Sequence, residues 1–298
     1  MVHYLTKSSY GTIVENNPNI DKVHLLSDDW NKIVEEIRNE EFDYVIDLHH
    51  NLRTLRLKKE LGIRTFAFNK LNVKKWIYTN LKLNLMPELH IVDRYMKTLE
   101  AFNVKNDGQG LDYFIPEKDE IKQKDIPASH HIGYIGIVIG AAHYTKKMPV
   151  EKLQELCSRI NHPIILLGGK EDSGNGDQIA SVDPIKIYNA CGKFNLNESA
   201  DLVRKSKLII THDTGLMHIA AAFKKKIISV WGNTVPQFGM YPYYGQQQIS
   251  NFRSEIASLR CRPCSKIGFS KCPKGHFKCM KQQSIDSLVG SVKLFLQS

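Results

Sequence analysis

Short apolar runs alternate with helix-patterned segments along this chain, and this alternation most constrains how it can fold. In the second half, four apolar runs are separated by helical patterns: runs at 134–139, 163–167, 207–210 and 226–231, helices at 150–159 and 197–205. Strands joined by helices at this spacing form a parallel sheet with right-handed crossovers. The sequence therefore predicts the α/β fold class.

The first half repeats the alternation, so the chain is expected to contain two units. Strand-like runs at 44–48 and 64–68 accompany helical patterns at 28–41 and 91–102. A chain of 298 residues is long enough for about two domains of roughly 100–200 residues. We expect one domain at residues 1–125 and a second at 126–298, closed by a helix over 284–296, with a cleft between them.

The charge favours an anionic partner. The net charge is +10, and residues 70–82 mix lysines with aromatic side chains on a predicted helix. This segment contacts an anionic acceptor or membrane surface, or it is simply a solvated basic face. No apolar run reaches the ~18 residues of a membrane span, and no signal-peptide core is recognisable, so a cytoplasmic protein is expected. No nucleic-acid-binding motif is recognised, which argues against a nucleic-acid partner.

The stretch 211–222 follows an apolar run and opens a helix of small residues. A strand that ends in a polar turn and leads into a helix exposes backbone N–H groups at the positive end of the helix dipole, which suits a phosphate or pyrophosphate. Asp213 or Thr214 can cap this helix, and Gly215 lets a ligand approach the backbone. The alternative is an ordinary helix cap, with His218 a packed histidine.

Four cysteines lie close together near the C-terminus, at Cys261, Cys264, Cys272 and Cys279. The first two form a C-x₂-C pair, and His276 lies between the others. In a cytoplasmic protein this spacing favours a structural zinc ion over disulfides, and free thiols are the competing interpretation.

Several of these segments together resemble glycosyltransferase family 9, the heptosyltransferases of lipopolysaccharide assembly. The resemblance is carried, in the expected order, by residues 44–54, 140–149, 167–172, 213–222 and 230–236. It implies a GT-B fold, in which two Rossmann-like domains face one another across a cleft. It also implies an inverting, metal-independent transfer of a sugar, heptose by default, from a nucleotide-sugar donor to an anionic glycolipid at the inner membrane face.

The resemblance assigns donor binding to residues of the second domain. Lys146 matches a donor-phosphate lysine, Glu171 or Asp172 would accept from ribose hydroxyls, and the pyrophosphate would lie on the helix start. The full donor-binding set is Thr145, Lys146, Glu171, Asp172, Asp213, Thr214, Gly215, Met217 and His218. No cofactor is expected to take part in catalysis.

The catalytic base is the point where this sequence departs from the family pattern. Family members usually carry a Ser-Ser-x-Gly-Asp loop after a first strand, and this sequence has no such segment. The N-terminal domain is therefore expected to be incomplete. His49 and Asp47 are weak candidates for the base, and His49 and Arg53 for contact with the acceptor or the sugar. A late gene start, a loop supplied by another chain, and a nucleotide-sugar-binding protein that has lost catalysis remain open.

Overall fold

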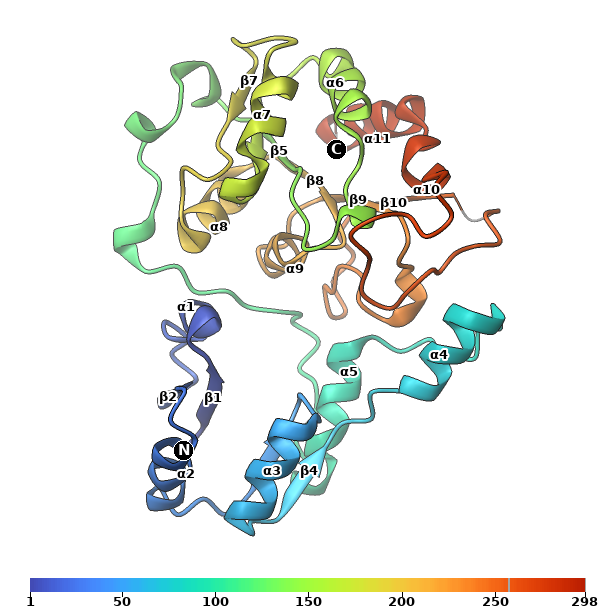
Figure 1. Cartoon of the computed structure of the whole chain (residues 1–298). Coiled ribbons are helices and arrows are strands. Elements are labelled where there is room, and N and C mark those ends of the chain that lie inside the picture. The colour runs from blue at the N-terminus through green and yellow to red at the C-terminus, as the bar shows by residue number, and fades with distance from the viewer. Residues whose placement is uncertain (257, 298) are drawn as a thin grey trace. The chain divides into compact units, whose positions relative to one another are not determined.

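The computed structural model of the chain describes residues 1–256 and 258–297, which form two compact units (Figure 1). Unit 1 consists of Met1–Asn72 and Leu89–Asp107, and unit 2 of Val73–Glu88 and Gly108–Ser298. Within the described residues, no helix is both long enough and apolar enough to cross a membrane. Both units are α/β, as the alternation of patterns predicts.

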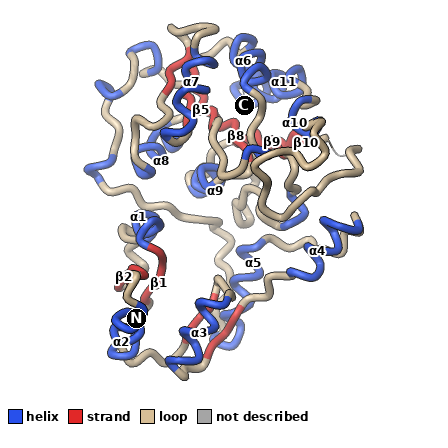
Figure 2. The backbone as a smooth tube through the Cα atoms, viewed as in Figure 1, coloured by secondary structure: helices blue, strands red, loops and turns tan. Residues whose placement is uncertain are grey.

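Unit 2 is built on a parallel sheet with the strand order β10-β9-β8-β5-β6-β7. Its strands are β5 Ile135–Val138, β6 Ile164–Leu167, β7 Ile187–Asn189, β8 Leu208–His212, β9 Ile227–Trp231 and β10 Asn251–Glu255. The strands are red in Figure 2. Ile135 of β5 lies opposite Ile164 of β6 and opposite Leu208 of β8. The chain therefore winds one way from β5 to β7 and the other way from β8 to β10, and the direction switches between β5 and β8.

Helices cover both faces of this sheet because successive strand residues point to opposite sides. They are α6 Val150–Arg159, α7 Ser173–Ala180, α8 Leu196–Lys205, α9 Gly215–Ala222, α10 Lys278–Lys281 and α11 Ile285–Gln297. Ile137 packs in one buried cluster with Leu156 of α6, whereas its neighbour Val138 packs in another with Leu202 of α8. The two clusters form a continuous core on each side of the sheet.

Local signals start these helices where the sequence predicts them. The helix predicted at 150–159 is α6, and Pro149 stands immediately before it. A capping box starts α8: Asn195 Oδ1 accepts from the Glu198 N–H at 2.9 Å, and Glu198 Oε2 accepts from the Asn195 N–H at 2.7 Å. These ends fix the lengths of the loops that leave the sheet.

Unit 1 contains two separate parallel sheets of two strands each. β1 His3–Lys7 pairs with β2 Lys22–Leu26, and β3 Val45–Asp47 pairs with β4 Thr65–Ala67. The helices of this unit are α1 Gly11–Val14, α2 Trp30–Asn39, α3 Leu52–Leu61 and α5 Ile91–Met96. Its buried cluster is small: Ile33, Val34 and Ile37 of α2 with Leu57 of α3.

The division between the units differs from the predicted boundary at 125/126. Residues 108–125 belong to unit 2, because this segment packs on α8: the Ile121 N–H donates to Asp201 Oδ2 at 2.7 Å. Residues 73–88, which include most of α4 Asn72–Leu81, also belong to unit 2. The Tyr78 ring packs edge-on against Phe238 at 5.7 Å, and Lys82 Nζ donates to the Pro263 carbonyl at 2.8 Å.

Candidate functional site

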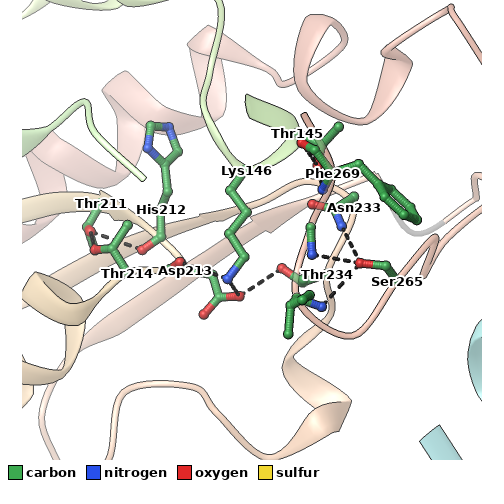
Figure 3. A network of polar contacts seen from close by, with 12 residues as sticks. Thr145, Lys146, Thr211, His212, Asp213, Thr214, Asn233, Thr234, Ser265 and Phe269 are labelled. Carbon is green, nitrogen blue, oxygen red and sulfur yellow. Dashed lines mark hydrogen bonds and ion pairs between the residues drawn. The ribbon is translucent and has the colours of Figure 1, made fainter. Parts of the chain in front are cut away.

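The loops that follow β5 and β8 lie where the winding direction switches, which is where open α/β sheets bind ligands. β5 leads into a turn at Tyr144–Lys146, and β8 leads through Asp213 and Thr214 into α9. Figure 3 shows Lys146 pointing toward Asp213 from the opposite loop. Residues predicted from two separate segments of the sequence are thus brought together.

Lys146 is held in place by Asp213. Its Nζ lies 2.7 Å from Asp213 Oδ2 and donates to the Asp213 carbonyl oxygen at 3.3 Å. Thr234 Oγ1 donates to the same Oδ2 at 2.9 Å (Figure 3). The lysine and aspartate side chains are 14% and 12% exposed, so their attraction is less weakened by water than that of a surface pair. The ammonium group is therefore fixed at one point just before α9.

Thr214, one of the two predicted residues, is the N-cap residue of α9, but its side chain makes no capping hydrogen bond. The Asp213 carboxylate is bound to Lys146, and Thr214 Oγ1 lies 3.2 Å from Thr211 Oγ1. A Cβ placed on Gly215 would meet no atom within 4 Å, so the space beside this turn is open. Uncapped N–H groups, the helix dipole and a neighbouring ammonium group together favour an anion.

His212, at the end of β8, connects the loop after β8 to the loop after β5. Its Nε2 accepts a hydrogen bond from the Met148 N–H at 3.0 Å. The ring is buried, and burial lowers the pKa of His212 to about 4, although the nearby Gly140 backbone opposes this shift. The imidazole is therefore neutral near pH 7 and able to accept. The sequence pattern does not mark His212, because its partner lies 64 residues away.

Lys147 points to a different partner from its neighbour. Its Nζ lies 2.6 Å from Asp172 Oδ1, and the Gly169 N–H donates to Asp172 Oδ2 at 3.1 Å. A Cβ on Gly140 would lie 2.3 Å from this carboxylate, so a glycine is required there. Asp172 is buried and holds loops together, whereas Glu171 is exposed. Of the two carboxylates predicted to accept from ribose, Glu171 is therefore the better placed to reach a ligand.

Met217 and His218, two further predicted donor contacts, differ in how exposed their side chains are. Met217 is fully buried in the cluster that contains Leu202, so its side chain does not line an open pocket as predicted. His218 is half-buried. Burial lowers the pKa of His218; the Asp213 carboxylate opposes this shift, and the Lys146 ammonium adds to it. His218 therefore responds to the same ion pair that stands at the start of α9.

A segment near the C-terminus closes against the lysine-bearing turn. The Phe269 N–H donates to Thr145 Oγ1 at 2.8 Å, and the Thr145 N–H donates to the Phe269 carbonyl at 3.1 Å. Ser265 Oγ, in the same segment, accepts from the Gly268 N–H at 2.6 Å and lies 3.5 Å from Asn233 Nδ2 (Figure 3). Thr145 is thus buried and hydrogen-bonded to backbone, which positions the turn, and its predicted donor contact stays a prediction.

In unit 1, Asp47 differs from the other predicted residues in being buried and fully engaged. Asp47 is buried; its Oδ1 accepts from the backbone N–H groups of His49 at 3.0 Å and His50 at 2.6 Å, and its Oδ2 lies 2.7 Å from Lys58 Nζ. Burial raises the pKa of Asp47, but these partners lower it further than burial raises it. A buried, strongly acidic carboxyl group is a poor general base, which argues against that role.

His49 and Arg53 are both exposed. His49 follows β3, and Arg53 lies in the first turn of α3, which begins with a capping box between Asn51 and Thr54. The two side chains therefore remain accessible to a ligand, as their predicted role requires.

None of the four clustered cysteines is paired in a disulfide in this structure. Burial, with the neighbouring thiols adding to it, raises the pKa of Cys264 to about 11. Cys261 Sγ lies 3.8 Å from His276 Nε2. Among the described residues, however, no three thiol or imidazole ligand atoms of this segment lie within 4.8 Å of one another. A structural zinc ion at Cys261, Cys264, Cys272 and Cys279 stays a prediction.

The model of one protein family matches residues 30–267, most of the chain; its description is glycosyltransferase family 9 (heptosyltransferase). The chain belongs to glycosyltransferase family 9. Over 91 residues it is 36% identical to lipooligosaccharide heptosyltransferase 2 of Haemophilus influenzae, covering 29% of this chain and 26% of that protein. Over 257 residues it is 24% identical to lipopolysaccharide heptosyltransferase 1 of Campylobacter coli, covering 78% of this chain and 75% of that protein.

Solved structures of family 9 proteins show the fold. The ADP-heptose LPS heptosyltransferase II of Escherichia coli matches with a TM-score of 0.74 at 15% identity, over 100% of this chain and 89% of that one. The GT-B fold class expected from the sequence is thereby confirmed. The first curated relatives are matched over only 26 to 42% of their own length.

Proposed function

We propose that this family 9 chain transfers a sugar, heptose by default, from a nucleotide-sugar donor such as ADP-heptose to a lipopolysaccharide-type glycolipid acceptor. The observation that carries the proposal is the Lys146–Asp213 pair beside the uncapped start of α9. It provides a fixed cation and free backbone donors at the switch in the sheet, which suits a diphosphate. The names of the matched relatives support heptose and lipopolysaccharide as the substrates.

In the proposed reaction, an acceptor hydroxyl attacks the anomeric carbon from the face opposite the diphosphate. The bond between that carbon and the diphosphate oxygen breaks, the diphosphate leaves with the electron pair, and configuration is inverted. Lys146 and the α9 N–H groups stabilise the charge that develops on the leaving group, so the proposed mechanism needs neither a metal ion nor a cofactor. Asp213 and Thr234 are positioning residues, since they act through Lys146.

The hydroxyl proton must pass to a base as the new bond forms. Asp47 is engaged by Lys58 and two backbone N–H groups, so His49 is the better candidate. We propose that His49 and Arg53 contact the acceptor or the transferred sugar, where a guanidinium group can pair with phosphate or carboxylate. A chain that binds the donor without turnover is the alternative.

Two adjacent lysines offer a matched test of this site. Lys146→Met should lower kcat for transfer from ADP-heptose by about 10²- to 10³-fold, as expected for losing one preorganised group that stabilises developing charge. Lys147→Met removes the same charge one residue away, where its partner is Asp172, and should lower kcat much less. Transfer is followed by mass spectrometry of the acceptor, and ADP binding by calorimetry.

Equal effects of the two substitutions would contradict the assignment of Lys146. Tight ADP-heptose binding by the unsubstituted chain, with no transfer to any lipopolysaccharide core acceptor, would support the binding-protein alternative instead.

The exposed face of α4 is the proposed contact with the membrane surface. Val73, Trp76 and Leu81 are 72%, 59% and 57% exposed, and Lys74 is exposed beside them. Basic residues interleaved with exposed apolar side chains favour an anionic interface. We propose a cytoplasmic protein bound peripherally at the inner membrane face.

Trp76→Glu should reduce co-sedimentation with anionic phospholipid vesicles several-fold and leave transfer to a soluble, delipidated acceptor unchanged. Vesicle binding that is equal for anionic and neutral lipid, or unaffected by the substitution, would favour a solvated basic face.

A further inference from the structure

Two histidines and a glutamate meet at the β1–β2 sheet of unit 1, and none of them is among the residues assigned to sugar transfer. His3 Nδ1 on β1 lies 3.1 Å from His24 Nε2 on β2. Glu40, which follows α2, places Oε2 3.7 Å from His3 Nδ1 and Oε1 4.0 Å from His24 Nε2. The three ligand atoms all lie within 4.8 Å of one another. β1, β2 and the end of α2, which lie together in Figure 1, therefore carry two imidazoles and a carboxylate to one point.

The site is formed largely inside the unit. The side chains of His24, His3 and Glu40 are 2%, 7% and 23% exposed. The Phe42 ring stands edge-on to both imidazoles, with ring centroids 4.9 Å from His3 and 6.4 Å from His24. Burial and the aromatic contact fix the ring positions, so the two nitrogens are held close together before any ligand arrives.

A second carboxylate orients His24. Glu36 Oε1 lies 2.5 Å from His24 Nδ1, and a carboxylate only accepts, so Nδ1 carries the proton. The Nε2 lone pair of the neutral ring then points toward His3. A ligating histidine whose other nitrogen donates to a carboxylate is the usual outer arrangement of protein metal sites. Glu36 is therefore placed as an outer-shell partner, not as a ligand.

The separation of the nitrogens fits a tetrahedral ion. Two imidazole nitrogens bound at ~2.0–2.1 Å in tetrahedral geometry are about 3.3 Å apart, close to the distance found here. We propose that His3, His24 and Glu40 bind a divalent ion of the zinc class, with the fourth position open to water. Two imidazoles and one carboxylate form the donor set of three-ligand zinc sites.

Lys22 competes with the ion for the glutamate. Its Nζ lies 2.5 Å from Glu40 Oε1, so Glu40 must exchange an ammonium group for the metal when the site fills. The Lys22 side chain is 47% exposed and can turn toward water. Removing this lysine should therefore strengthen metal binding, whereas removing either histidine or Glu40 should weaken it. A cluster that merely holds the sheet together would not respond in these opposite directions.

Occupation of the site would join β1, β2 and the end of α2 where the unit has a small core. An ion that binds only the folded arrangement stabilises it in proportion to the logarithm of its concentration over Kd. The metal should therefore slow hydrogen exchange in β1, β2 and α2, and have little effect on β3, β4 and α3.

The test uses the full chain, produced without added histidines, stripped with a chelator and titrated with Co²⁺. An imidazole–carboxylate site gives visible ligand-field bands, whereas Co²⁺ bound by the cysteine segment adds strong near-ultraviolet sulfur-to-metal charge transfer. The spectra therefore distinguish the two sites. Competition between Zn²⁺ and Co²⁺ then gives the Zn²⁺ affinity of the imidazole–carboxylate site. His276→Gln, beside Cys261, is the control and should leave the ligand-field bands unchanged.

His3→Gln and Glu40→Gln should each weaken binding by more than the ~10- to 100-fold typical of losing an outer-shell partner, and Glu36→Gln should weaken it within that range. Lys22→Met should tighten binding several-fold. Circular dichroism shows which variants fold; if the buried His24→Gln does not fold, His3, Glu40 and Lys22 still decide the question. Absence of ligand-field bands, or bands that persist in both His3→Gln and Glu40→Gln, would overturn the proposal.

Discussion

The two units use the same alternating pattern but are stabilised in different ways. Unit 2 joins β5 to β10 in a continuous parallel sheet with a buried cluster on each face. Unit 1 has two separate pairs of strands, a small apolar cluster, and buried polar groups such as Asp47 and His24. A continuous sheet places the carboxyl ends of β5 and β8 side by side, which is what assembles the lysine site. Polar contacts have a larger relative part in unit 1.

The largest expected difference is in the loss of unfolding free energy when a leucine side chain is truncated in each core. Leu156→Ala, at a fully buried position in unit 2, should destabilise that unit by about 4–5 kcal/mol, and Leu57→Ala in unit 1 by about 2–3 kcal/mol. The smaller core around Leu57 leaves fewer contacts to lose. Hydrogen exchange followed by mass spectrometry measures each unit separately. Equal costs would show that the two cores are packed alike.

A polar substitution should act on unit 1 alone. Asp47→Asn removes the charge that pairs with Lys58, which is 15% exposed, and should destabilise unit 1 by about 2–3 kcal/mol at pH 7. Because the folded pKa of Asp47 is lowered, its contribution is present at neutral pH and is lost as the pH falls below the ordinary aspartate value. Denaturation between pH 7 and pH 3 checks this. A loss of transfer greater than the loss of folded protein would restore Asp47 as a base.

The smallest expected effect is a mild acid sensitivity of unit 2. His212 has a folded pKa of about 4, below its ordinary value, so the unfolded chain binds the extra proton more readily between these values. The contribution of neutral His212 is complete above about pH 6.5, and about 2 kcal/mol of it is lost by pH 5. His212→Gln keeps an acceptor for the Met148 N–H and should remove this slope. If the stability of this variant still falls between pH 6.5 and pH 5 as in the unsubstituted chain, other groups cause the acid sensitivity.

Much of the architecture follows from local signals in the sequence. The helix predicted at 150–159 and the strand at 163–167 match α6 and β6 within one residue, because an apolar run or an amphipathic pattern marks each of them. β7 and β10 carry no such mark. β7 has three residues and β10 reads Asn-Phe-Arg-Ser-Glu, at the two edges of the sheet, so their pairing depends on a neighbouring strand.

The site was predictable where residues lie close together in the sequence. The segment 211–218 is found in that way, whereas Lys146 is assigned only through the family resemblance. The choice of Asp213 as ion partner instead of helix cap is decided by this lysine, 67 residues away. Thr234, Ser265 and Phe269 enter through contacts between distant segments, and no local pattern reveals them. Met217 is buried in the core, and a helix that is apolar nearly all round does not tell from its sequence which side chains face a ligand.

Hydrogen bonds hold the turn that carries Lys146 on both sides. His212 accepts from the Met148 N–H, and the Phe269 N–H donates to Thr145. The conformational entropy of that loop is therefore lost when the chain folds, and not again in each catalytic cycle. A donor should meet a lysine that is already in position, so its association rate should be governed by diffusion and charge instead of by loop rearrangement. The protein would then bind its donor in a single kinetic phase.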